Sequence, residues 1–124
     1  MIWQFPKTLF INVKRFIHYP IPRKIKDRIF CEEEVMDLKV FSQDIIENLE
    51  GQRNGKYKLV GYIDHYGEIG YGHYTAYTAQ TNGEDTSWCN FDDIKTKKIG
   101  STNKLSLFNE GSSDIYIMAL ELVE

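Results

Sequence analysis

The dipeptide Asn82-Gly83 places the strongest constraint on the fold of this chain, because it stands between two segments that are expected to form strands. Asn-Gly is the typical centre of a two-residue hairpin, since a type I′ turn requires positive φ at both central positions. The sequence therefore predicts a hairpin of two antiparallel strands, at residues 73–80 and 87–91.

The predicted turn sets which residues face each other across this hairpin. Tyr77 then faces Trp88, and four residues away along the first strand His73 faces Asp92. Directly opposed residues share a face of the sheet and have Cβ atoms about 4.5–5.5 Å apart. The Asp92 carboxylate can there accept a hydrogen bond from His73, fix its tautomer and stabilise the imidazolium that forms on proton transfer. A longer loop with an odd register would separate the two side chains.

A histidine paired with an aspartate is the base and orienter of a nucleophilic site, although geometry alone favours a purely structural pair. Gly72 immediately precedes His73, and residues 66–72 form a loop that also holds Gly67 and Gly70. Glycines let another backbone approach closely, and mobile loops often gate sites. These features favour a functional pair.

The rest of the chain predicts one domain of mostly strands with a single helix at residues 42–51. Ser42 suits the start of that helix and Gly51 suits its end. Strands are expected at residues 8–16, 26–30, 57–65, 94–99 and 115–123, loops at 18–24 and 66–72, and a turn at 53–56. Residues 101–109 carry no clear pattern. This order indicates an α+β fold around a mostly antiparallel sheet, with residues 115–123 in its middle.

The composition argues against several classes of partner. The chain has 124 residues and a formal net charge of −3, which does not favour nucleic acid or an anionic membrane surface. No apolar run approaches the ~18 residues of a membrane span, and the N-terminus lacks the apolar core of a signal peptide. We therefore expect a soluble protein of the cytoplasm or nucleus. The glutamates at residues 32–34 are expected to form a solvated face, with an acidic dock for a basic partner as the alternative.

The two cysteines, Cys31 and Cys89, are far apart and form no C-x-x-C pair. They make neither a disulfide framework nor a zinc site, and free cysteine packs as a small hydrophobic residue. We expect both to be buried free thiols in a reducing compartment. The sequence predicts no metal and no cofactor.

Six blocks of the chain, taken in order, resemble the C-terminal part of the catalytic domain of ubiquitin-specific proteases, the papain-like cysteine deubiquitinases. Residues 72–77 are similar to the family's histidine box, and residues 88–93 are similar to its W..FDD box. These two boxes, in this order and spacing, are highly specific. The other blocks are residues 5–16, 24–27, 57–67 and 116–120. The resemblance covers nearly the whole chain and implies the palm subdomain of the family's catalytic domain.

The resemblance also implies a role for each residue of the site. His73 would be the general base that deprotonates a catalytic cysteine, Asp92 would orient it, and Asp93 would support the pair. The loops at residues 66–72 and 18–24 would close over the C-terminal tail of ubiquitin, so the implied partner is ubiquitin or a ubiquitinated protein. Three residues are expected to contact that tail, namely Tyr71, Gly72 and Tyr74.

The nucleophile is the main departure from the family pattern. The family's cysteine box lies far upstream of the matching region, and neither Cys31 nor Cys89 stands at a helix start, as that box requires. We expect the C-terminal portion of a deubiquitinase that is inactive as an isolated chain, with the missing N-terminal part of the catalytic domain as a further partner. An exposed apolar surface is expected where the two parts meet. The alternatives are a non-catalytic relative that binds ubiquitin or another protein, and a β-rich domain without a link to ubiquitin.

Overall fold

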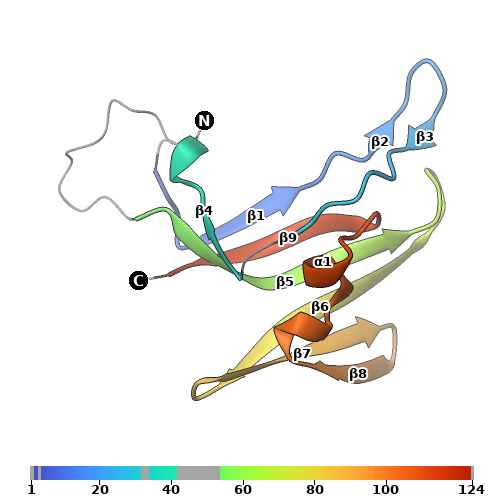
Figure 1. Cartoon of the computed structure of the whole chain (residues 1–124). Helices are drawn as coiled ribbons and strands as arrows, with labels where there is room; N and C mark the ends of the chain where they lie inside the picture. Colours follow the sequence, from blue (N-terminus) through green and yellow to red (C-terminus); the bar gives the residue numbers. More distant parts are fainter. Residues whose placement is uncertain (1, 3, 32–33, 42–53, 124) are drawn as a thin grey trace.

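The computed structural model describes residues 2, 4–31, 34–41 and 54–123. The predicted helix at residues 42–51, together with Glu32, Glu33 and Arg53, lies outside the described residues. Strand pairing in the described part is antiparallel throughout, and only short helical segments accompany the sheet, which confirms the predicted α+β class (Figure 1). None of the helices in these ranges could span a bilayer.

The main sheet has seven strands in the order β1-β9-β5-β6-β7-β8, with β4 paired to the start of β5. Its strands are β1 (Thr8–Asn12), β4 (Val35–Asp37), β5 (Lys56–Tyr66), β6 (His73–Asn82), β7 (Asp85–Asp92), β8 (Lys95–Gly100) and β9 (Ile115–Leu122). A second sheet, β2 (Phe16–Ile17) and β3 (Arg23–Lys24), forms an arm of residues 16–24 that projects beyond the end of β1 (Figure 1). The helical segments are η1 (Lys39–Phe41), η3 (Thr102–Lys104) and α1 (Ser106–Asn109).

The long strands lie where the sequence predicts them. β5, β6, β7 and β8 match the expected strands, and β9 lies inside the sheet between β1 and β5. Residues 101–109, which carried no clear pattern, hold η3 and α1. Cys31 is a buried free thiol as predicted, whereas Cys89 is only half-buried, because it belongs to β7 near one edge of the sheet.

Three predictions about the first part of the chain are wrong in detail. The strand expected at residues 8–16 ends at Asn12 and resumes as β2 only at Phe16. Residues 26–30 contain no strand, only an isolated bridge between Ile29 and Ser112. The end of the expected loop at residues 18–24 is instead β3, which pairs with β2. Arg15, between β1 and β2, explains the first two differences.

The hydrophobic core lies between the sheet and the segment that carries η3 and α1 (Figure 1). Leu105 and Leu107 of this segment are buried together with Trp88 of β7 and Leu59 of β5. The Trp88 indole N–H donates to Thr102 Oγ1 at 3.1 Å, so the one polar atom of this large ring is satisfied. The segment thus covers one face of the sheet.

The Arg15 side chain is the main polar connection inside the protein. Only 1% of the residue is exposed, and its guanidinium donates four hydrogen bonds to backbone carbonyls. Nε donates to Ile115 O at 2.6 Å, Nη1 to Asp27 O at 2.8 Å and Ile25 O at 3.0 Å, and Nη2 to Ser112 O at 3.0 Å. Because residues 25–27 give two carbonyls to Arg15, those carbonyls are not available for a β-ladder.

We predict that Arg15→Met destabilises the protein by at least about 3 kcal/mol, because four carbonyls lose their donor and a buried unsatisfied group costs about 1–3 kcal/mol. Urea unfolding followed by tryptophan fluorescence measures the change. Arg23→Met is the matched control, since Arg23 is an exposed arginine of the neighbouring arm, and its effect is expected within about 0.5 kcal/mol. Equal stabilities for the two variants would contradict the role of Arg15.

Candidate active site

The hairpin of β6 and β7 turns one residue later than the sequence predicts. Its two central residues are Gly83 and Glu84, and Asn82 remains in the strand. Gly83 has a φ of 67°, and a glycine at the first central position is typical of a type II′ turn. The pairing therefore shifts by two residues, so that Tyr77 faces Asn90.

His73 and Asp92 nevertheless come together. A shift of two residues keeps every side chain on its face of the sheet, whereas a shift of one would reverse it. The two residues are diagonal neighbours rather than directly opposed, a separation that long side chains can bridge. Nε2 of His73 lies 2.5 Å from Oδ1 of Asp92. The predicted hydrogen bond is present, although the direct pairing from which it was derived is wrong.

The electrostatics of this pair favour a charged imidazole. The hydrogen bond that His73 Nε2–H donates to Asp92 raises the pKa of His73. The negative charges of Asp92 and Asp93 also raise it, whereas partial desolvation lowers it. The side chains of His73 and Asp92 are 45% and 43% exposed, so solvent reaches both. With Nε2 engaged by the carboxylate, Nδ1 is the nitrogen left to exchange a proton with another group.

Asp93 lies beside the pair, at the first position of the turn between β7 and β8. Its φ is 53°, a left-handed conformation that aspartate tolerates better than most residues. The ligand atoms of His73, Asp92 and Asp93 lie within 4.8 Å of one another, close enough for a divalent ion to bridge. His73 and Asp92 already bond each other directly, and all three residues are exposed or half-buried.

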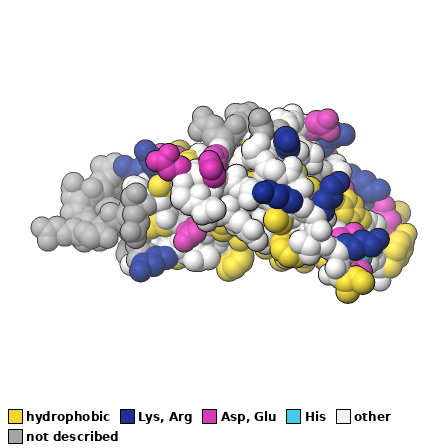
Figure 2. All heavy atoms as spheres, turned by 90° about the horizontal axis from the view of Figure 1, so that it is seen from below, with side chains coloured by type: hydrophobic (Ala, Val, Ile, Leu, Met, Phe, Trp, Pro, Cys, Tyr) yellow, Lys and Arg dark blue, Asp and Glu magenta, His cyan; other side chains and the backbone are white. Residues whose placement is uncertain are grey.

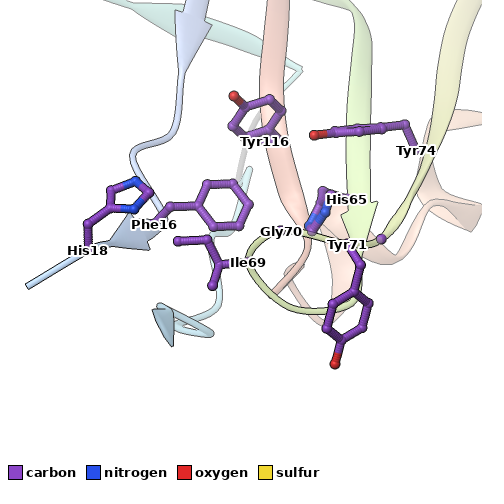
Figure 3. Close-up of a pocket in the computed structure, with 9 residues that line it drawn as sticks. Phe16, His18, His65, Ile69, Gly70, Tyr71, Tyr74 and Tyr116 are labelled. Carbon is purple, nitrogen blue, oxygen red and sulfur yellow. The ribbon is translucent and has the colours of Figure 1, made fainter. Parts of the chain in front are cut away.

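The residues on either side of His73 line a cavity of about 510 Å³ (Figure 3). One wall comes from the arm and another from the loop between β5 and β6, and aromatic rings from three strands of the main sheet close it. The lining residues are Phe16, His18, His65, Ile69, Gly70, Tyr71, Gly72, Tyr74 and Tyr116. In Figure 3, the rings of Phe16, Tyr74 and Tyr116 surround His65, whereas the ring of Tyr71 points away from them.

The structure divides the predicted site residues into two adjacent sets. Tyr71, Gly72 and Tyr74 line the cavity. Tyr71 is 70% exposed and Tyr74 is 54% exposed. The second set, His73, Asp92 and Asp93, is not part of the cavity lining. His73 joins the two, because it is flanked by cavity residues in the chain and bonded to Asp92 through space.

Sequence reasoning missed the inner part of the cavity. His65, Phe16 and Tyr116 were read only as parts of strands or of family blocks, yet all three line it. The ring centroids of Phe16 and His65 are 5.2 Å apart, and those of Phe16 and Tyr116 are 5.8 Å apart. A histidine at the end of a strand, directly before a glycine-rich loop, was the one available signal.

Lys24 holds the arm against the main sheet at this cavity. Its ammonium group donates to the backbone carbonyl of His65 and lies 3.0 Å from Oδ1 of Asp114. The Lys24 side chain is buried, which is unusual for lysine unless its charge is paired. A second ion pair, Lys26 Nζ to Glu68 Oε1 at 2.7 Å, connects the segment after the arm with the loop between β5 and β6.

Comparison with known proteins places these features in a family context. The family model described as ubiquitin carboxyl-terminal hydrolase matches residues 1–118. Ubiquitin carboxyl-terminal hydrolase 10 of Arabidopsis thaliana is 32% identical over 113 residues, which cover 90% of this chain and 11% of that protein. Ubiquitin carboxyl-terminal hydrolase 15 of Homo sapiens is 32% identical over 94 residues, which cover 74% of this chain and 9% of that protein. The chain thus spans about a tenth of these relatives.

Solved structures show the same fold. A SAGA DUB module that contains Ubp8 matches with a TM-score of 0.74 at 22% identity, over 98% of this chain and 25% of that chain. A SAGA DUB module bound to monoubiquitin matches with a TM-score of 0.71 at 23% identity, over 96% of this chain and 24% of that chain.

We predict that Asp92→Asn lowers the pKa of His73, because the amide removes the negative charge and leaves only a weaker, neutral acceptor for the imidazolium. Asp93→Asn is expected to lower it less, since Asp93 acts on His73 through charge alone. An NMR titration of the imidazole resonances in the presence of EDTA measures both variants. An unchanged pKa in Asp92→Asn would show that the pair is not formed in solution.

Proposed function

Because this chain belongs to the ubiquitin carboxyl-terminal hydrolase family, we propose that it supplies the base and the tail-binding surface of a cysteine deubiquitinase. The reaction would be hydrolysis of a peptide, isopeptide or thioester bond at the C-terminus of ubiquitin. The observation that carries the proposal is the 2.5 Å contact between His73 Nε2 and Asp92 Oδ1, beside a cavity lined by the neighbours of His73.

In this proposal His73 moves the protons of the reaction. Its Nδ1 takes the proton of a cysteine thiol, and the thiolate attacks the carbonyl carbon at the end of ubiquitin to give an acyl-enzyme. The imidazolium then gives its proton to the leaving amine, and His73 next acts as base for the water that hydrolyses the thioester. Asp92 orients the ring and stabilises its charged form, and Asp93 adds negative charge nearby.

We propose that the thiol comes from residues outside this sequence. Cys31 is buried, its N–H bonds Leu107 O at 3.1 Å, and burial raises the pKa of its thiol, which opposes the thiolate form. Cys89 lies three residues before Asp92 on β7, and side chains alternate along a strand, so it belongs to the other face of the sheet. On this basis the isolated chain would bind but not hydrolyse.

The cavity suits an extended chain with small side chains. Tyr71, Gly72 and Tyr74 would contact the C-terminal tail of ubiquitin between the arm and the loop of residues 67–72. The ion pair between Lys26 and Glu68 connects the segment after the arm to this loop. The fold shared with a DUB module bound to monoubiquitin supports ubiquitin as the partner.

Exposed apolar residues support the missing part of the catalytic domain as a second partner. Ile94, next to Asp93 at the turn of β7 and β8, is 98% exposed, and Phe91 is exposed on the same hairpin. Figure 2 shows one face of the molecule, on which hydrophobic side chains gather towards one end among lysines and arginines. Such a surface is typical of an interface that is covered in the complete protein.

A non-catalytic, ubiquitin-binding role is the second candidate. It is favoured by the state of the two cysteines, since Cys31 is buried and Cys89 lies on the face of the sheet opposite to Asp92. Both candidates require ubiquitin binding, and they differ only in whether a thiol joins His73 in the complete protein.

We predict that this chain shifts the resonances of the C-terminal tail in an NMR titration of ¹⁵N-labelled ubiquitin, and that Tyr74→Ala weakens the binding. Tyr19→Ala is the matched control, because Tyr19 is an exposed tyrosine of the arm that does not line the cavity. Ubiquitin without its last residues is expected to bind less tightly. Flat spectra at high concentration of both proteins would contradict tail binding.

We predict that a ubiquitin probe with a thiol-reactive C-terminus forms no adduct at Cys31 or Cys89, as checked by mass spectrometry of the whole chain. Burial limits access to Cys31, and Cys89 lies on the wrong face for His73. An adduct that disappears in His73→Ala would show that one of these thiols is the nucleophile and would overturn the assignment of an external one.

A further inference from the structure

His65, at the end of β5, has no role in the proposed chemistry but is built into the site. The residue is 4% exposed, and its Nδ1 is buried without a hydrogen-bond partner in the described part of the protein. Buried polar atoms are normally bonded, so such an atom calls for a reason. Burial, followed by the charge of Lys24, lowers the pKa of His65. Both effects favour the neutral form of the ring.

The His65 ring fills the space where residue 72 would otherwise carry a side chain. A Cβ on Gly72 would lie 2.2 Å from His65 Nε2, 2.8 Å from His65 Cε1 and 2.5 Å from the carbonyl oxygen of Tyr66. Gly72 does not have a positive φ, so its conformation does not call for glycine. What requires glycine at this position is the close approach of these atoms.

His65 itself is firmly held on both sides. Its backbone N–H donates to Asp114 O at 2.8 Å, and its carbonyl accepts from the buried ammonium group of Lys24. Its ring packs against Phe16 and against Tyr74, with centroids 5.2 Å and 4.9 Å away. The ring is thus a fixed surface rather than a mobile group.

The His65 ring contacts the residue that directly precedes the proposed base, His73. Gly72 is the residue before His73, and His73 pairs with Tyr66, the residue after His65, in the ladder of β5 and β6. The pairing of β6 with β7 extends only as far as Ala76. The start of β6 is therefore held by β5 and by the contact with His65.

We propose that His65 is a positioning residue for the base, whose ring packs against Gly72 and holds the start of β6 where His73 meets Asp92. That His73 acts as the base rests on the proposed function, but the positioning itself is a property of this chain and needs no substrate. The His65 ring positions β6 by steric packing rather than through a hydrogen bond of Nδ1, which is buried and has no partner among the described residues.

The test is a double-mutant cycle of His65→Ala and Gly72→Ala in the whole chain, with the pKa of His73 measured by NMR in the presence of EDTA. Each single variant is expected to lower the pKa of His73, because the hydrogen bond with Asp92 forms in a smaller fraction of molecules. Gly72→Ala is expected to lower it less when His65 is alanine, since one of the two steric conflicts is then absent. Part of the effect of Gly72→Ala remains in that background, because the new Cβ still meets the carbonyl oxygen of Tyr66.

Gly70→Ala is the matched control within the same loop. A Cβ on Gly70 would meet nothing within 4 Å, while its φ of 84° still introduces local strain in the loop. We expect this variant to leave the pKa of His73 unchanged. If His65→Ala does not fold, His65→Val takes its place in the cycle, because valine also lacks the ring atoms that a Cβ on Gly72 would meet.

Two outcomes would overturn the proposal. The first is a pKa of His73 in His65→Ala that equals that of the original protein, and the second is the same effect of Gly72→Ala in both backgrounds. Because no ubiquitin is present, failure here is distinct from failure of the proposed function. A failed ubiquitin titration with an intact mutant cycle would reject tail binding and keep the positioning role.

Discussion

The four hydrogen bonds of the buried Arg15 guanidinium are the interaction on which the site depends. They join the connection between β1 and β2 to the backbone after the arm and to the start of β9. A buried cation is costly unless every donor finds an acceptor, so this side chain fixes the relative positions of all three segments. The arm leaves the sheet at this point, and it forms one wall of the cavity.

A second buried cation continues this framework towards the base. Lys24 connects the arm with the carbonyl of His65, and the His65 ring packs against the residue before His73. His65 and His73, eight positions apart, thereby lie in environments that shift their pKa values in opposite directions. Burial lowers the pKa of His65, whereas a partly exposed carboxylate raises that of His73. The environment of each ring, rather than its identity, decides which of them can carry a proton.

Local patterns predicted the strands well and predicted the pairing less well. β5, β6, β7 and β9 were visible because alternation and turn residues are local signals. The end of β1 and the irregular stretch at residues 26–30 were not predicted. Both depend on Arg15, whose hydrogen bond to Ile115 O joins residues 100 positions apart in the sequence. The roles of His65 and Lys24 were hidden for the same reason. Their partners are supplied by elements that meet only in the folded protein.

The meeting of His73 and Asp92 was predicted from a hairpin register that was wrong by two residues. It survived because side chains alternate with a period of two, so only an odd error would have moved Asp92 to the opposite face. Gly83 favours the type II′ turn that the structure adopts, and either turn preserves the face. The even shift in register keeps His73 and Asp92 on one face of the sheet, but as diagonal rather than directly opposed neighbours. Contact then depends on where β6 begins, which is why the packing of His65 against Gly72 bears on the base.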